Sequence, residues 1–143
     1  VNINELNNLI LKIGVENGNI SFSNSSVYWK DDLEIQFKES LLSYDQEKIN
    51  LIGKVIINII NKDDFYRSYQ VKKNFRKNIK KIEFDFFYNL ENKSISFDNV
   101  RIDGLSSPNI DKYINKFNSQ KNTSFNKITL KNFINNFFKT YSG

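Results

Sequence analysis

Carboxylates are the side chains on which any acid–base chemistry of this sequence would have to rest, because its 143 residues include no His and no Cys. Without those two residue types the chain offers no imidazole for proton transfer, no thiol nucleophile, no disulfide and no ordinary zinc site. The first carboxylate pair to consider is Glu83 and Asp85, which stand two residues apart and alternate with Ile82, Phe84 and Phe86. Such alternation places both carboxylates on the solvated face of a strand.

An enzyme that uses carboxylates needs two of them opposed in one cleft, as glycosidases have. The residues that would have to converge in pairs are Asp31, Glu83, Asp85 and Asp98, but nothing in their spacing marks a cleft. The sequence also lacks a D-x-[DN]-x-[DN]-G calcium loop and a Gly-rich phosphate loop. We therefore expect a protein that is not an enzyme and that uses no metal and no cofactor.

The basic residues are concentrated in one segment, residues 62–81, which carries eight Lys or Arg against two Asp, whereas the whole chain has a net charge of +5. Two interpretations are open. The segment is either a solvated connection or a binding site for an anionic surface such as lipid headgroups. The candidate residues for anionic-surface binding are Arg67, Lys72, Lys73, Arg76, Lys77, Lys80 and Lys81.

Aromatic residues lie among these charges, which raises a nucleic-acid-binding module as an alternative function. Tyr66, Tyr69 and Phe75 could stack bases beside the basic side chains. Core packing is the better explanation for the three rings, so nucleic acid is the less favoured partner. We expect contacts within the fold to hold Arg76 and Lys77 in position, since they stand just ahead of a predicted strand.

Most of residues 8–103 alternate between hydrophobic and polar side chains, which predicts strands that bury one face. Asn17-Gly18 between two such runs predicts a type I′ hairpin. A short strand is expected at 27–29, a long pair at 33–43 and 48–60 joined by a turn at 44–47, and another pair at 81–90 and 94–103. Asp98-Asn99 interrupts the last run as a β-bulge would. Together these runs predict an antiparallel meander of six to seven strands.

The period changes to a helical one in two places. Residues 62–80 predict a basic, helical crossover, for which Asp63 or Asp64 would be the N-cap. Residues 108–141 predict two amphipathic helices, the first introduced by Ser107-Pro108 and the second capped by Thr129. The fold class is therefore α+β, in a single domain or domain fragment covering residues 1–143.

The second C-terminal helix carries the most apolar stripe in the chain, so we expect it to lie against the apolar face of the sheet. The doubly apolar run at residues 56–60 further suggests a central strand that is covered on both faces. The residues assigned to the apolar face are Ile35, Phe37, Leu51, Val55, Ile57, Ile82, Phe84, Phe86, Phe133, Phe137 and Phe138.

The order of motifs resembles the C-terminal region of AsmA-like proteins. The matching stretches are Asn17-Gly18-Asn19-Ile20-Ser21-Phe22, Leu51-Ile52-Gly53-Lys54, Asp64-Phe65-Tyr66 with Gln70 and Arg76-Lys77, Ile82, Asp98-Asn99 to Ile102-Asp103, and the final Phe-rich helix. In that family a chain anchored in the inner membrane builds a long, curved β-sheet in the periplasm of Gram-negative bacteria. Its apolar face is thought to carry lipid between the two membranes.

The resemblance implies a non-enzymatic segment of a longer, periplasmic, inner-membrane-anchored protein that serves lipid transport or outer-membrane biogenesis. Phospholipid or an anionic membrane surface would be the partner, together with the rest of the longer chain. The start at Val1 and the end directly after an apolar run also favour a segment of something longer. A purely structural interaction domain remains an open alternative.

Overall fold

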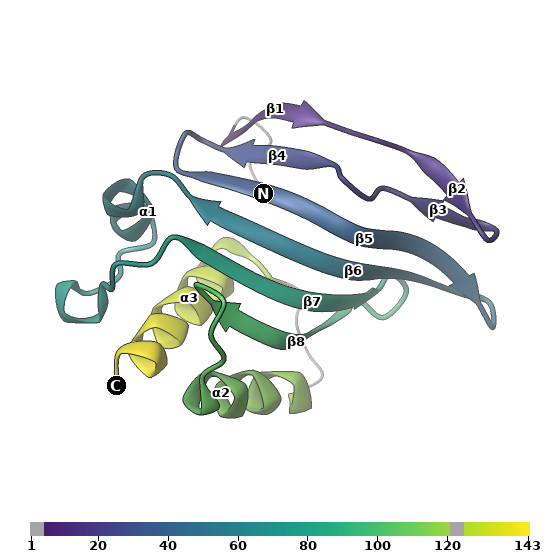
Figure 1. Ribbon diagram of the computed structural model, residues 1–143. Coiled ribbons are helices and arrows are strands. Elements are labelled where there is room, and N and C mark those ends of the chain that lie inside the picture. The colour runs from purple at the N-terminus through teal and green to yellow at the C-terminus, as the bar shows by residue number, and fades with distance from the viewer. Residues whose placement is uncertain (1–4, 121–124) are drawn as a thin grey trace.

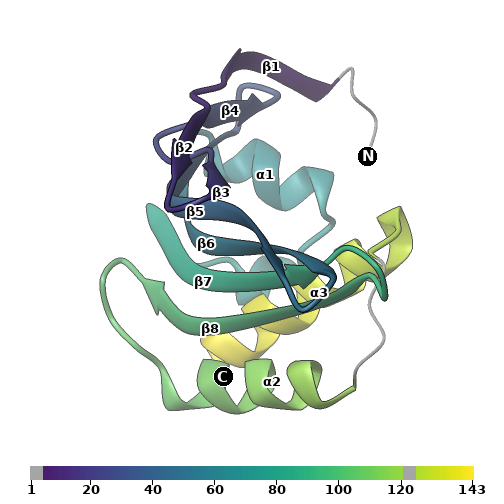
Figure 2. The same cartoon turned by 90° about the vertical axis from the view of Figure 1, so that its right-hand side faces the viewer.

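The computed structural model describes residues 5–120 and 125–143, and it forms one curved antiparallel sheet with helices on its concave side (Figures 1 and 2). The sheet has eight strands in the order β1-β4-β5-β6-β7-β8, and the β2–β3 hairpin pairs with β5 through β3. The predicted α+β fold, with an antiparallel sheet followed by C-terminal helices, is confirmed, but the sheet has eight strands instead of six to seven and is not a simple meander, since β1 pairs with β4 and β3 with β5. The strands are β1 (Leu6–Ile10), β2 (Gly14–Glu16), β3 (Asn19–Ser21), β4 (Ser26–Trp29), β5 (Leu33–Asp45), β6 (Lys48–Ile59), β7 (Lys81–Asn89) and β8 (Ser94–Ile102).

Two hairpin turns are set by residues with positive φ. Asn17 and Gly18 have φ values of 49° and 80°, as the predicted type I′ turn requires. Gln46 and Glu47, with φ values of 47° and 63°, join β5 to β6. The second turn is therefore tighter than the predicted one at 44–47, and the two long strands pair as far as Asp45 and Lys48.

Two bulges interrupt the long strands. The predicted one is present at Asn99, whose φ is 52° and opposite which the β7–β8 register shifts between Glu83 and Asp85. A second bulge, which the sequence did not reveal, lies at Glu39 in β5, where φ is 47°. Bulges bend a strand and increase its twist, which is consistent with the curvature visible in Figure 2.

The predicted helical crossover at 62–80 is only partly correct. It is divided into α1 (Lys62–Ser68) and a short 3₁₀ turn, η2 (Lys73–Phe75), and the rest of the segment is not helical. The α1 N-cap is Asn61, whose side-chain oxygen accepts the Asp64 N–H at 3.2 Å, so neither Asp63 nor Asp64 is the cap.

Tertiary contacts override helix propensity in the rest of that segment. Gln70 has a φ of 54°, which ends the helix, and Val71 is then buried in the core. The Tyr66 hydroxyl donates to the Lys77 carbonyl oxygen at 2.7 Å and accepts the Lys77 N–H at 3.2 Å. These bonds hold the chain in an extended path that leads into β7.

The two C-terminal helices are α2 (Pro108–Ser119) and α3 (Lys127–Ser142). Ser107 precedes Pro108 as the predicted N-cap of α2. The N-cap of α3 is Asn126 rather than Thr129, which is instead the third helical residue of a capping box with Asn126. Among the helices in the described residues, none is both long and apolar enough to cross a membrane.

The core lies between the concave sheet face and the helices. Phe137 and Phe138 of α3 are buried there, as predicted for the most apolar helix. Asn118 of α2 donates to the Phe97 carbonyl oxygen and accepts the Phe97 N–H, so α2 lies along the edge strand β8. The buried cluster is Leu33, Phe65, Tyr66, Val71, Ile79, Ile82, Val100, Ile102, Ile110, Ile114, Phe137 and Phe138.

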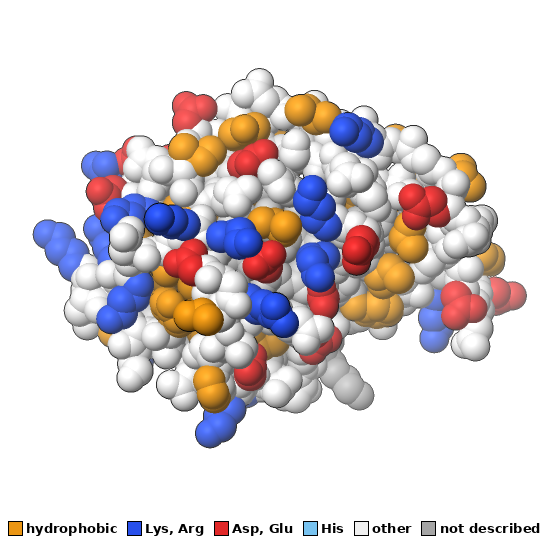
Figure 3. Space-filling view, viewed as in Figure 1, with side chains coloured by type: hydrophobic (Ala, Val, Ile, Leu, Met, Phe, Trp, Pro, Cys, Tyr) orange, Lys and Arg blue, Asp and Glu red, His pale blue; other side chains and the backbone are white. Residues whose placement is uncertain are grey.

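The expectation that both faces of β6 are covered is wrong. Ile60, which follows β6, is 58% exposed, and all helices of the described residues lie on one side of the sheet (Figure 2). The other side, which faces the viewer in Figure 3, carries basic and acidic side chains interspersed. Lys54 and Asp85 are cross-strand partners on this side, and Lys54 Nζ lies 3.9 Å from Asp85 Oδ1.

Candidate functional site: an apolar cavity beneath the C-terminal helix

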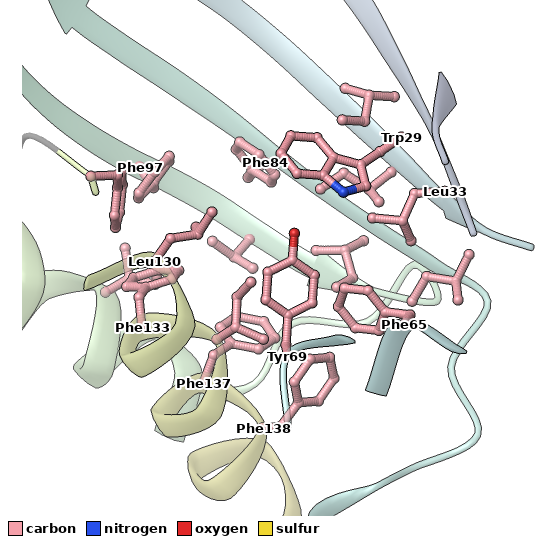
Figure 4. A pocket seen from close by; sticks show the side chains of 18 residues that line it. Trp29, Leu33, Phe65, Tyr69, Phe84, Phe97, Leu130, Phe133, Phe137 and Phe138 are labelled. Atoms are coloured by element: carbon pink, nitrogen blue, oxygen red, sulfur yellow. The ribbon is translucent and has the colours of Figure 1, made fainter. Parts of the chain in front are cut away.

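A cavity of about 250 Å³ lies between the concave face of the sheet and helix α3 (Figure 4). Its lining comes from β4 to β8, all three α-helices, and Phe125 just before α3. Every described residue of the lining is aliphatic or aromatic, and among these residues the Tyr69 hydroxyl and the Trp29 indole N–H are the only side-chain polar groups. The cavity is therefore suited to an apolar ligand.

Seven of the residues predicted for the apolar face line this cavity. Ile35, Ile57 and Ile82 are cross-strand partners in β5, β6 and β7, so their side chains form one row across the floor. Helix α3 provides the opposite wall. The seven are Ile35, Ile57, Ile82, Phe84, Phe133, Phe137 and Phe138.

The other four predicted residues are not part of the cavity lining. Phe37, Leu51, Val55 and Phe86 lie on the same sheet face as Ile35, Ile57, Ile82 and Phe84, and farther toward the β5–β6 turn than the row of three isoleucines. Phe37 packs edge-on against Phe22, with ring centroids 5.6 Å apart. Only part of this sheet face therefore contributes to the cavity.

Eleven cavity residues were not assigned to the apolar face from the sequence. Some had a usable signal, because Leu33, Ile59 and Phe97 continue the same alternation. Others, such as Phe65 and Tyr69 of α1 and its C-cap, reach the cavity only because of the tertiary fold. The eleven are Trp29, Leu33, Ile59, Phe65, Tyr69, Phe97, Val100, Ile114, Phe125, Leu130 and Ile134.

Stacked phenylalanine rings close one side of the cavity. Phe125 stacks on Phe117 of α2 at 5.6 Å with an interplanar angle of 7°, and Phe133 packs edge-on against Phe117 at 4.9 Å. Tyr113 donates its hydroxyl to the Phe133 carbonyl oxygen at 3.1 Å. Burial raises the pKa of Tyr113 to about 12, so the hydroxyl keeps this proton at physiological pH.

A second, polar pocket of about 270 Å³, the vestibule, adjoins the cavity. The two spaces share four lining residues, which are Trp29, Tyr69, Phe125 and Leu130. The vestibule adds charged and polar side chains that the inner cavity lacks, namely Glu5, Lys30, Ser68, Asn126, Lys127 and Lys131. An elongated molecule could therefore occupy both spaces at once.

The basic segment is divided between side chains bound within the protein and side chains in solvent. Arg67 pairs with Asp64, and Lys81 pairs with Glu83 at 3.2 Å. Arg76 donates to the Val71 carbonyl oxygen at 2.8 Å, and its guanidinium lies 5.9 Å from the centroid of the Tyr66 ring. Lys72, Lys73, Lys77 and Lys80 are exposed, and so is Arg67, whose side chain is 69% exposed despite its pairing with Asp64.

Arg76 is thus structurally placed, as expected, whereas Lys77 is held through its backbone alone. The aromatic residues of the segment do not form a surface for base stacking. Tyr66 is 1% exposed, and Tyr69 lines the cavity.

The four carboxylates considered for catalysis do not line the apolar cavity. Asp85 and Asp98 are cross-strand partners, but Asp85 accepts a hydrogen bond from Asn99 at 2.6 Å and lies near Lys54 on the exposed face. Glu83 is paired with Lys81, and Asp31 lies in the turn between β4 and β5. This arrangement does not bring them together in one cleft.

The native fold disfavours the charged form of the Asp32 carboxylate. It is 8% exposed, and burial together with the nearby Asp64 carboxylate raises its pKa above the ordinary value of 3.8. Because the native pKa is raised, the proton leaves the unfolded chain first as the pH rises. Charging Asp32 therefore destabilises the native state, fully so above the native pKa.

We expect Asp32→Asn to raise the free energy of unfolding at neutral pH relative to the wild type. This difference in the free energy of unfolding should shrink as the pH falls and vanish below 3.8, the pKa of the aspartate in the unfolded chain. Urea denaturation at a series of pH values measures this difference. Asp31→Asn, a change at the exposed neighbouring position, is the matched control. An advantage of Asp32→Asn that does not depend on pH would contradict the electrostatic explanation.

Comparison of the chain with models of protein families, with curated proteins and with solved structures finds no match. The resemblance to AsmA-like proteins therefore stays a prediction from the sequence, and the function has to be argued from the cavity.

Proposed function

We propose that this domain binds the hydrocarbon chain of a lipid in the apolar cavity and acts in lipid handling without catalysing a reaction. The observation that carries the proposal is a cavity of about 250 Å³ whose lining, within residues 5–120 and 125–143, contains no charged residue. Protein interiors are normally packed like organic crystals, with few voids larger than a water molecule. A void of this size is therefore a feature that needs an explanation.

Apolar side chains that line an unfilled space lack neighbours there and lose dispersion contacts. Water offers little relief, because the site has few polar groups to bond it, and even a cavity of about 150 Å³ lined by Leu, Ile and Phe stays dry and binds benzene. An apolar ligand would recover the missing dispersion contacts. Binding of a hydrocarbon chain thus stabilises the protein while it removes the chain from water.

The cellular setting of this proposal comes from the resemblance alone. A segment of an AsmA-like protein would handle phospholipid in the periplasm, as part of an inner-membrane-anchored chain that serves outer-membrane biogenesis. The curved sheet with an apolar concave face agrees with that role. The exposed Lys72, Lys73, Lys77 and Lys80 would lie against anionic headgroups in such a setting.

Displacement of a fluorescent apolar probe by dodecanol tests the proposal. We expect saturable binding by the wild type and at least a roughly tenfold loss in Ile134→Trp, because the larger side chain fills the cavity from α3. Ile128→Trp is the matched control, since Ile128 lies on the same helix and is 70% exposed. Circular dichroism checks that both variants are folded.

Failure of the wild type to bind dodecanol would contradict the proposal. Equal affinity of the wild type and a folded Ile134→Trp variant would place any binding elsewhere on the protein. Native mass spectrometry after gentle purification adds an independent measurement, because a ligand acquired in the cell should appear as a mass adduct that Ile134→Trp lacks.

A further inference from the structure

The vestibule of the cavity carries a charge pattern that the proposed function has not used. Three lysines, Lys30, Lys127 and Lys131, line it together with one carboxylate, Glu5. Glu5 neutralises the charge of Lys30, since its carboxylate lies 3.7 Å from the Lys30 ammonium group. Among the described residues that line it, the vestibule therefore has an excess of two positive charges.

The other two lysines are not neutralised by carboxylates. Lys131 donates to the side-chain oxygen of Gln70, which is uncharged. Within residues 5–120 and 125–143, no carboxylate lies within ion-pair distance of Lys127 or Lys131. Both belong to the N-terminal part of α3, where the helix dipole adds positive potential.

Two polar groups mark the boundary between the apolar cavity and the charged vestibule. The Trp29 indole and the Tyr69 ring line both spaces, and Figure 4 shows the Tyr69 hydroxyl pointing toward Trp29. Burial and the Glu5 carboxylate raise the pKa of Tyr69, so its hydroxyl remains a hydrogen-bond donor at neutral pH. The apolar cavity and the cationic vestibule thus adjoin at two residues with polar groups.

This order matches the order of groups in an anionic amphiphile. We propose that the ligand is a single-chain carboxylate such as a fatty acid, with its chain in the cavity and its head between Lys30, Lys127 and Lys131. The inference rests on the proposed function, because it assigns the chain to the same cavity. A single chain is favoured because a space of about 250 Å³ lies below the roughly 300–1,000 Å³ of common ligand pockets.

The test compares three ligands of equal chain length, dodecanoate, dodecanol and dodecyltrimethylammonium, by displacement of the same probe at low salt. We expect the wild type to bind dodecanoate roughly tenfold more tightly than dodecanol, since a few partly exposed ion pairs each contribute up to about 1 kcal/mol. Dodecyltrimethylammonium should bind most weakly. Raising the salt concentration should reduce the preference for dodecanoate.

Charge variants test whether the vestibule lysines cause the preference for dodecanoate. In Lys30→Gln/Lys127→Gln/Lys131→Gln the affinity ratio of dodecanoate to dodecanol should fall to about one, whereas Glu5→Gln should increase the ratio. The matched control is Lys48→Gln/Lys93→Gln/Lys112→Gln, which changes the net charge equally at exposed positions outside the vestibule. Because each variant is measured with both ligands, residual dodecanol binding reports that it is folded.

The outcomes separate the two proposals. Wild-type protein that binds dodecanol and dodecanoate equally, or that prefers the cationic amphiphile, overturns the carboxylate site but leaves chain binding intact. Loss of the preference in the control triple variant as well would show that it reflects net charge alone, which also overturns the site. A wild type that binds none of the three ligands overturns the proposed function itself.

Discussion

Replacing Phe138 with alanine is expected to lower the free energy of unfolding by about 3–5 kcal/mol, the range for truncation of a buried phenylalanine. Phe138 is 1% exposed and lies where α1 and α3 meet. Its ring centroid is 5.0 Å from that of Tyr66 and 5.8 Å from that of Phe65, in edge-on contact with both. The truncation would remove these contacts and enlarge the adjacent cavity, since Phe138 also contributes to its lining.

Urea denaturation followed by circular dichroism measures this loss. Ile128→Ala on the same helix is the matched control, because Ile128 is 70% exposed and surface substitutions usually change stability by less than about 0.5 kcal/mol. A loss of less than about 1 kcal/mol in Phe138→Ala would mean that α3 does not lie against α1 and the sheet as described.

The elements that the sequence predicted well are those specified by local signals. Asn17-Gly18 determines a turn by its own backbone preferences, and the alternation in β5 to β8 determines which side chains share a face. Once neighbouring strands pair in register, Ile35, Ile57 and Ile82 must form one row. The apolar stripe of α3 then has that row as its natural partner.

The wrong predictions have two kinds of cause. Residues 69–72 and 76–80 are not helical because Val71 is buried in the core and Tyr66 bonds the backbone of Lys77, neither of which is visible in local propensity. The α3 cap was misplaced for a local reason. Asn126 and Thr129 bond each other's backbones in a capping box, so each resembles a cap.

The cavity itself was beyond prediction from the sequence. Alternation indicates which residues point inward, but it does not indicate whether their side chains fill the space between sheet and helix. That outcome depends on the distance of α3 from the sheet and on α1, whose Phe65 and following Tyr69 reach the same space. The vestibule depends equally on tertiary structure, because Lys30 and Lys131 are far apart in the chain and both line the vestibule only in the folded protein.

The unpredicted bulge in β5 has a consequence for Gly53 in the neighbouring strand. The bulge at Glu39 brings Ser40, which is fully buried, against Gly53 of β6. A Cβ added at Gly53 would lie 2.3 Å from Ser40 Oγ and 2.6 Å from Ser40 Cα. Rotation of the serine side chain cannot relieve the contact with Cα, so the strands themselves would have to separate.

Gly53→Ala is therefore expected to lower the free energy of unfolding by about 1–3 kcal/mol or more, as overpacking of a well-packed site does. Gly14→Ala is the matched control, because a Cβ at Gly14 meets no atom within 4 Å. Urea denaturation of the two variants measures the difference. Adding Ser40→Gly to Gly53→Ala should restore only part of the loss, since it removes the contact with Oγ but leaves the contact with the Ser40 backbone. Stability equal to the wild type in Gly53→Ala would contradict the close approach of β5 and β6 at the bulge.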